Sequence, residues 1–192
     1  MKALPLEKLP EGDWLYEIKH DGYRAFVFKD GKDVRLVSRN KDAFDYPQLL
    51  DALKLLPAEY FILDGEIAAL DEKGRSSFQL LQDFKSSGDV PLVYYVFDLL
   101  FLDRKDLRKE PLSTRRKLLA NLLKKPPENI RLSDELRGSK DDLLRVAQEF
   151  GLEGSGRQTP KFSLRKRSSQ RRLDQIQDHQ VSGVRYRRLH VA

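Results

Sequence analysis

Short apolar runs separated by turn residues fill the first part of the chain. Runs rich in aromatic and β-branched residues occupy 14–20, 23–29, 34–38, 60–64 and 66–70. Three Asp-Gly pairs, which begin at Asp21, Asp30 and Asp64, lie between neighbouring runs. An Asp-Gly pair between two such runs is a strong local signal for an antiparallel hairpin. We therefore predict hairpins at the first two pairs and two separate strands on either side of the third.

Helical spacing and one long apolar run complete the pattern. Apolar residues recur at helical intervals in 46–56, 77–84, 112–123 and 140–150. The run 91–102 is almost continuously apolar and rich in Val, Tyr and Phe, which is typical of a strand buried on both faces. The predicted fold class is therefore α+β, with a mostly antiparallel sheet and helices packed against it.

The composition excludes several kinds of site. The chain of 192 residues contains no cysteine and three histidines that are far apart in the sequence, so we expect neither a disulfide nor a zinc site. No apolar run approaches the roughly 18–20 residues of a membrane helix, and the first residues lack the apolar core of a signal peptide. We expect a cytoplasmic protein with no membrane partner.

The positive charge is concentrated at one end of the chain. The net charge is +6, but residues 155–192 contain ten Lys or Arg and two Asp or Glu, whereas 1–154 contain 26 and 28. The tail also has few apolar residues and no periodicity, which predicts no regular structure. We therefore divide the chain into an organised domain, 1–154, and a basic tail, 155–192.

Lys19 is the strongest candidate for chemistry. It stands at the end of a predicted strand in the series Glu17-Ile-Lys19-His-Asp-Gly-Tyr-Arg24. A lysine amine attacks a phosphate in its neutral form, and partial burial and nearby cations such as Arg24 favour that form. Taken alone, the pattern is more typical of a surface hairpin with a solvated lysine.

The pattern belongs to an ordered series. Lys19-x-Asp-Gly-x-Arg is followed by Ser-Arg-Asn at 38–40, Asp-Gly-Glu at 64–66, Val-Phe-Asp at 96–98 and Glu-Gly at 153–154. This series resembles the covalent nucleotidyltransferases, and within them bacterial ATP-dependent DNA ligases of the end-joining ligase D type. The resemblance covers about 1–154 and implies an ATP-grasp-like nucleotidyltransferase core.

The resemblance also implies roles for individual residues. Lys19 would form the phosphoramidate with AMP, Glu17 would lie by the adenine, and Arg24 by the ribose and phosphate. Glu66 would hold the ribose or order metal-bound water, and Phe97 would stack on the purine. The remaining implied roles concern DNA and metal: Ser38, Arg39 and Asn40 would touch the DNA backbone, and Glu153 with Glu66 would bind Mg²⁺ or Mn²⁺, which prefer carboxylate oxygens.

The pattern departs from the family after Gly154. The family continues with a lysine shortly after this glycine, then a Trp-x-Lys-x-Lys segment and an OB-type domain, whereas residues 155–192 contain neither motif. The missing lysines neutralise the triphosphate as pyrophosphate leaves. A shift of one base after the Gly154 codon can restore both lysine motifs in register. We therefore interpret the tail as the product of a shifted reading frame, with the C-terminal part of the core and the OB domain missing.

These observations lead to one expected function and two alternatives. We expect a monomeric ATP-dependent DNA ligase core that acts on nicked or broken double-stranded DNA in repair or recombination, with impaired activity. The first alternative is an RNA ligase or capping-type guanylyltransferase, which uses the same lysine chemistry. The second is a catalytically inactive module that binds nucleic acid through its basic tail.

Overall fold

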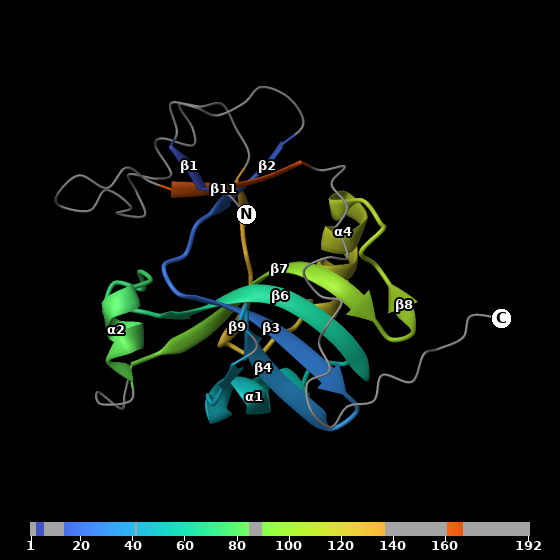
Figure 1. Ribbon diagram of the computed structural model, residues 1–192, viewed down its shortest axis with the longest axis horizontal. Helices are drawn as coiled ribbons and strands as arrows, with labels where there is room; N and C mark the ends of the chain where they lie inside the picture. The colour runs from blue at the N-terminus through green and yellow to red at the C-terminus, as the bar shows by residue number, and fades with distance from the viewer. Residues whose placement is uncertain (1–2, 6–13, 41, 85–89, 137–160, 167–192) are drawn as a thin grey trace.

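The computed structural model describes residues 3–5, 14–40, 42–84, 90–136 and 161–166. In these ranges the chain forms a larger and a smaller β-sheet and three helices (Figure 1). All strand pairs are antiparallel except one, in which β9 runs parallel to β7. The predicted α+β class with mostly antiparallel sheets is confirmed.

The larger sheet has seven strands and forms the body of the domain. Its strands run in the order β5-β4-β3-β6-β7-β8, and β9 pairs with β7. Their bounds are β3 Tyr23–Asp30, β4 Asp33–Ser38, β5 Ala43–Phe44, β6 Tyr60–Ala69, β7 Leu92–Leu102, β8 Lys105–Asp106 and β9 Ile130–Leu132. The apolar run of β7 is buried along most of its length. This strand lies between β6 on one edge and β8 and β9 on the other, and the helices α1 and α4 pack against it.

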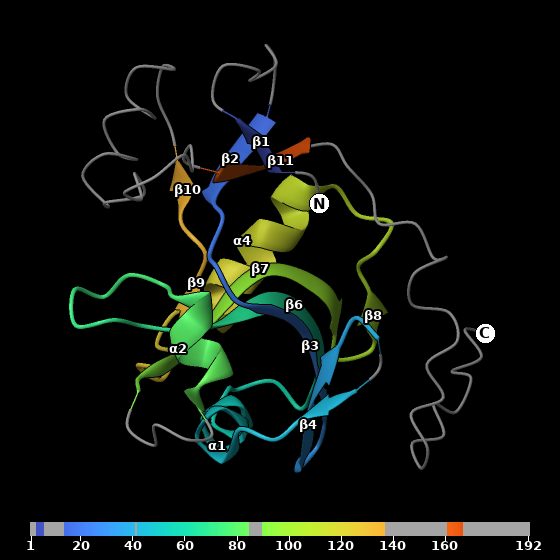
Figure 2. The same ribbon diagram turned by 60° about the vertical axis from the view of Figure 1, so that its left-hand side comes forward.

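The smaller sheet lies beside one end of the larger one (Figure 2). Its four strands run in the order β1-β11-β2-β10. Their bounds are β1 Ala3–Pro5, β2 Trp14–Ile18, β10 Glu135–Leu136 and β11 Lys161–Lys166. Strand β11 comes from the basic tail, a segment for which composition predicts no regular structure, and it lies between β1 and β2. Backbone pairing on both edges accounts for a strand that the apolar pattern does not indicate.

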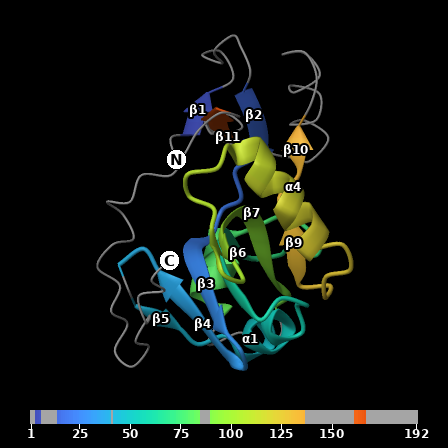
Figure 3. The same cartoon turned by 90° about the vertical axis from the view of Figure 1, so that its right-hand side faces the viewer.

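The three helices agree closely with the apolar spacing. Helix α1, Pro47–Lys54, begins at a proline, which suits the first helical turn, and buries Leu49 and Leu53. Helix α2, Phe78–Gln82, begins after Ser77, whose hydroxyl accepts a hydrogen bond from the Leu80 amide. Helix α4, Leu112–Leu122, packs on β7 and faces the viewer in Figure 3.

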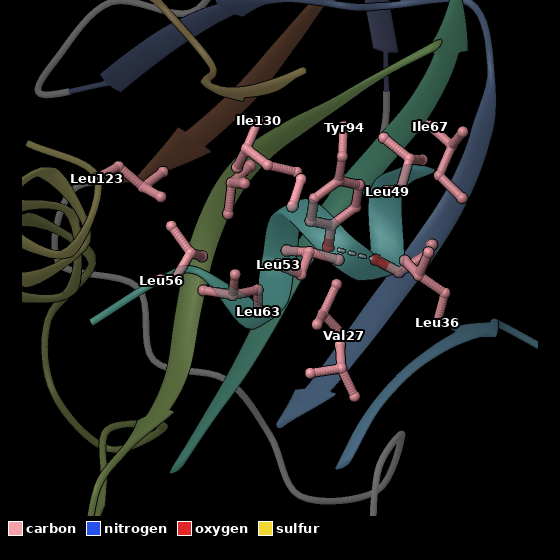
Figure 4. Packing of buried hydrophobic residues seen from close by; sticks show 14 of the residues in the cluster. Val27, Leu36, Leu49, Leu53, Leu56, Leu63, Ile67, Tyr94, Leu123 and Ile130 are labelled. Carbon is pink, nitrogen blue, oxygen red and sulfur yellow. Dashed lines mark hydrogen bonds between the residues drawn. The ribbon is translucent and has the colours of Figure 1, made fainter. Parts of the chain in front are cut away.

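A single apolar core fills the space between the larger sheet and the helices. Figure 4 shows residues of β3, β4, β6 and β7 packed against leucines of α1. Tyr94 is fully buried, and its hydroxyl donates a hydrogen bond of 2.9 Å to the Ala25 carbonyl, so the polar end of this side chain is paired inside the core.

The three Asp-Gly pairs have three different structures. Only the pair at Asp30 forms the predicted hairpin, between β3 and β4, where Gly31 has a φ of 57°. The prediction at Asp21 is wrong, because the chain there leaves the smaller sheet and enters the larger one. The two separate strands predicted around Asp64 are also wrong, because β6 runs through this pair with only a register shift.

Some expectations fall on other parts of the chain. The predicted helix at 140–150 and most of the tail lie outside the described residues. No helix in the part of the chain that the structure describes is long and apolar enough to cross a membrane.

Candidate active site

Lys19 lies where the chain passes from one sheet to the other. Strand β2 ends at Ile18, and β3 of the larger sheet begins at Tyr23. The connection is pressed onto β6, because a Cβ at Gly22 would lie 2.0 Å from the carbonyl oxygen of Ile67. Glycine is therefore required here by space, and half-buried Lys19 is held at the junction.

Arg24 is the second residue of β3 and reaches the junction from that end of the strand. Its Nε donates to Asp64 Oδ1 at 3.0 Å and its Nη2 to Asp64 Oδ2 at 2.7 Å. This two-point pairing fixes the plane of the guanidinium. Asp64 is fully buried on β6, so the position of Arg24 is set by the core of the larger sheet.

Glu66 faces both cations. It is directly opposite Arg24 in the pairing of β3 with β6. Burial raises the pKa of Glu66 to about 7, while the charges of Lys19 and Arg24 act in the opposite direction. The neighbouring carboxylates of Asp64 and Asp21 add to the rise. Lys19, Arg24 and Glu66 thus share one electrostatic environment, although Glu66 comes from a separate motif.

His20, next to Lys19, is anchored to β7. Its ring stacks on Tyr95 with a centroid separation of 3.5 Å and an interplanar angle of 8°. Burial, together with the nearby charges of Lys19 and Arg131, lowers the pKa of His20 to about 4. At neutral pH the imidazole is therefore uncharged, and it holds the connection after Lys19 without adding a cation.

Glu17 and Phe97 are joined through a residue of helix α4. Glu17 is 1 % exposed, and its Oε1 accepts a hydrogen bond of 3.0 Å from Arg116 Nη1. The same nitrogen lies 3.4 Å from the Phe97 carbonyl oxygen. Phe97 itself is 4 % exposed, and the guanidinium carbon of Arg24 lies 5.7 Å from its ring centroid. A base that stacks on this ring has to take the place of a neighbouring side chain.

The Ser-Arg-Asn segment lies at the same end of the larger sheet. Ser38 pairs with Ala25, the neighbour of Arg24. The Ser38 hydroxyl accepts hydrogen bonds of 3.1 Å from the amides of Asn40 and Asp42, which fold the segment into a tight turn. Arg39 and Asn40 are exposed at the tip of this turn.

The expected metal ligands are not brought together within the described residues. Glu153 lies outside them. Among the residues that the structure does describe, no group of three Asp, Glu or His side chains is arranged to hold a metal ion.

The motif series does not identify two residues of the site. Asp64 belongs to the Asp-Gly-Glu motif, but its bond to Arg24 follows from the strand register, in which Asp64 and Glu66 share one face of β6. Arg116 gives no signal in the sequence, because a charged residue on an amphipathic helix is usually solvated.

Comparison with known proteins agrees with the motif series. The family model described as "ATP dependent DNA ligase domain" matches residues 3–155. The chain is 39 % identical over 153 residues to the multifunctional non-homologous end joining protein LigD of Pseudomonas aeruginosa, covering 78 % of this chain and 18 % of that protein. It is 38 % identical over 172 residues to DNA ligase C1 of Mycolicibacterium smegmatis, covering 81 % and 48 %. The chain thus spans less than half the length of either relative.

Solved structures give the same result. The ligase domain of LigD from M. tuberculosis matches with a TM-score of 0.74 and 29 % identity, covering 89 % of this chain and 54 % of that one. A mycobacterial DNA ligase D complexed with ATP and MES matches with a TM-score of 0.68 and 29 % identity, covering 83 % and 50 %. The predicted resemblance and nucleotidyltransferase fold are confirmed.

Proposed function

This chain belongs to the family of ATP-dependent DNA ligase domains, and we propose that it transfers AMP from ATP to the Nζ of Lys19. The observation that carries the proposal is the junction itself, where Lys19 shares one charged environment with Arg24 and Glu66. In this step the lysine nitrogen forms a bond to the α-phosphorus, the bond to the bridging oxygen breaks, and pyrophosphate leaves. The amine gives up its proton to solvent.

The neighbouring residues have distinct roles in this proposal. Arg24, fixed by Asp64, contacts the ribose and the α-phosphate. Glu66 contacts the ribose, and Glu17 and Phe97 contact the adenine. Exposed Arg39 and Asn40, with Ser38, contact the DNA backbone, since a guanidinium and amides at a turn tip suit phosphate oxygens.

A divalent cation, Mg²⁺ or Mn²⁺, fits the chemistry of the site. The raised pKa of Glu66 means that its neighbouring cations do not fully offset the cost of burying its charge, and a divalent cation would favour the ionised form. Glu66 and Glu153 would hold the ion, directly or through water. It would supply positive charge at the phosphate oxygens.

The later steps need DNA. The adenylate on Lys19 passes to a 5′-phosphate at a nick or break in double-stranded DNA, and a 3′-hydroxyl then displaces AMP. We propose that residues 1–154 are the ligase core, acting as a monomer in the cytoplasm or nucleoid. The tail, 155–192, is the product of a shifted reading frame. Since the tail lacks the family's lysines, we expect weak self-adenylylation and no efficient nick sealing.

Labelling with α-³²P ATP and Mg²⁺ tests the first step. We expect weak covalent labelling that is lost in Lys19→Ala and kept in Lys32→Ala, which changes an exposed lysine of the β3–β4 turn. Labelling that survives Lys19→Ala would refute the assignment of the nucleophile. Full-strength labelling that is lost in Lys19→Ala would refute the expected role of the missing lysines, and stronger labelling by GTP would favour a capping-type enzyme.

The charge of the tail supports a second function, binding of DNA without catalysis. Residues 167–192 contain six Lys or Arg and two Asp or Glu, and their removal leaves β11 in place. If the tail is the binding element, a chain lacking 167–192 loses affinity for duplex DNA at low salt and keeps its unfolding temperature. Unchanged affinity would refute this second function. The nucleotide sequence of the gene tests the frame, since stop codons in the shifted frame would exclude it.

A further inference from the structure

We infer that Arg116 is a positioning residue that makes the site prefer adenine to guanine. The inference rests on the proposed function, in which Glu17 and Phe97 contact the base, and it adds a residue outside every motif of the series. Arg116 donates hydrogen bonds to the side chain of Glu17 and to the backbone carbonyl of Phe97.

The guanidinium of Arg116 joins three separate segments. It donates to Glu17 Oε1 on β2 at 3.0 Å and to the Phe97 carbonyl on β7 at 3.4 Å. Its Nη2 also donates to the carbonyl of Ser133, between β9 and β10, at 2.7 Å. One side chain thus sets the distance between the smaller sheet, which carries Glu17, and the larger sheet, which carries Phe97.

Helix α4 gives Arg116 a fixed starting point. The preceding residue, Arg115, is buried and donates to both carboxylate oxygens of Asp98, at 2.8 and 3.1 Å. Asp98 follows Phe97 on β7, so this pair holds α4 onto the strand beside the proposed base contact. Consecutive helical residues point about 100° apart, which directs Arg116 toward β2 while Arg115 faces β7.

The ion pair with Arg116 determines what Glu17 can bind. An ionised carboxylate only accepts hydrogen bonds. The exocyclic amino group of adenine donates a hydrogen bond, whereas guanine has an accepting oxygen at the same position. A charged Glu17 therefore attracts adenine and repels guanine.

Removal of Arg116 would leave Glu17 buried without this cation. Glu135 lies opposite Glu17 in the pairing of β10 with β2, so a second carboxylate shares that face. Without the bond from Arg116, the Glu17 carboxylate is no longer held in place relative to Phe97. Its contact with the adenine amino group then weakens, and the preference for adenine over guanine falls.

Equilibrium binding of ATP and GTP tests the inference. All measurements use the full chain carrying Lys19→Ala, by isothermal titration with Mg²⁺, so that no covalent step interferes. We expect Arg116→Met to weaken ATP binding by about tenfold, the loss that corresponds to one charge-assisted hydrogen bond, and to change GTP binding much less. The control is Lys117→Met, which removes a charge from the exposed neighbour on α4 and should leave both affinities unchanged.

Two further variants separate positioning from folding. Arg116→Lys keeps the positive charge, but its single ammonium group cannot bond to all three acceptors of the guanidinium. This variant should therefore show a preference for ATP over GTP that lies between those of the wild-type residue and Arg116→Met. Glu17→Gln should lower the preference by itself and should make Arg116→Met nearly silent when the two are combined. These two variants keep the test decisive if Arg116→Met does not fold.

The outcomes distinguish the inference from the proposed function. An unchanged ratio of ATP to GTP affinity in Arg116→Met and Arg116→Lys would overturn the inference, whether or not Lys19 is labelled. A ratio that depends on Arg116, in a chain whose intact Lys19 takes no label, would overturn the proposed reaction and keep the inference. Binding of neither nucleotide would overturn both.

Discussion

The ion pair between Asp98 and Arg115 gives a sharp test of the core. Asp98 on β7 and Arg115 on α4 have exposed fractions of 0 % and 1 %, and their paired atoms lie 2.8 and 3.1 Å apart. Asp98→Asn would leave the charge of Arg115 buried without its carboxylate. Breaking one partner of such a pair costs about 3–5 kcal/mol of unfolding free energy. A loss of this size is a large fraction of the roughly 5–15 kcal/mol that stabilises a domain.

The surface of the same molecule supplies a matched control. Asp106 and Arg108 are also an aspartate and an arginine in two-point contact, with Nη2 to Oδ2 at 2.6 Å and Nε to Oδ1 at 2.9 Å. Their exposed fractions are 44 % and 23 %. Because solvent screens an exposed pair, Asp106→Asn should cost only about 0–1 kcal/mol. The difference between the two variants therefore isolates the effect of burial.

Urea unfolding followed by circular dichroism measures both changes. The midpoint and slope of each curve give the unfolding free energy, and an unchanged slope shows that the comparison is valid. The combined change Asp98→Leu with Arg115→Met should recover most of the loss, since apolar replacement of a whole buried pair is often close to neutral. If Asp98→Asn lowers the unfolding free energy no more than Asp106→Asn does, the pair of Asp98 and Arg115 is not buried as described.

Three further predictions concern β6 and the connection after Lys19. Gly65→Ala should cost about 1–3 kcal/mol in urea unfolding, because the new Cβ would lie 2.5 Å from the Tyr95 carbonyl oxygen, and no loss would contradict the described spacing of β6 and β7. The pKa of Glu66 rises from 4.5 to about 7 on folding, so its carboxyl contributes stability that is lost as pH rises through that interval. The pKa of His20 falls from 6.5 to about 4, so its imidazole contributes stability that is lost as pH falls through that interval, and the two contributions oppose each other in the wild-type protein. The unfolding free energy of Glu66→Gln minus that of wild type should therefore rise with pH between 4.5 and about 7, and that of His20→Phe minus wild type should rise as pH falls from 6.5 to about 4. A difference that does not vary with pH would refute the corresponding shift, and an imidazole NMR titration midpoint near 6.5 would contradict the burial of His20.

The sequence predicts the elements better than it predicts how they connect. Apolar spacing places the three described helices and the buried strand β7 to within a few residues, while the helix predicted at 140–150 lies outside the described residues. The Asp-Gly pairs show the limit of local pattern. Asp30-Gly31 forms a hairpin with positive φ, whereas Gly22 and Gly65 are needed because another backbone or a tyrosine ring lies too close for a side chain. The sequence around the three pairs is alike, and only the packing of distant strands separates a turn from a close contact.

The site shows the same division. Motif order identifies Lys19, Arg24 and Glu66 as neighbours, and the structure places these three in one charged environment. Their roles toward ATP and DNA stay predictions, as do those of the other site residues. The bond from Arg24 to Asp64 could be derived from the sequence only with the register of β3 and β6 in hand, since those residues are 40 positions apart.

Arg115 and Arg116 explain why the supporting residues of the site escape a motif search. Both are arginines on one helix, and composition cannot tell them apart. Arg115 pairs with a carboxylate 17 positions away in the larger sheet, and Arg116 with one 99 positions away in the smaller sheet. The turn of about 100° between consecutive helical residues directs Arg115 to Asp98 of the larger sheet, whereas Arg116 also reaches Glu17 of the smaller sheet. Their functions therefore differ although their chemistry is the same. Helix α4 thereby connects the two sheets at the site. This function depends on tertiary packing, and the spacing of residues in the sequence does not indicate it.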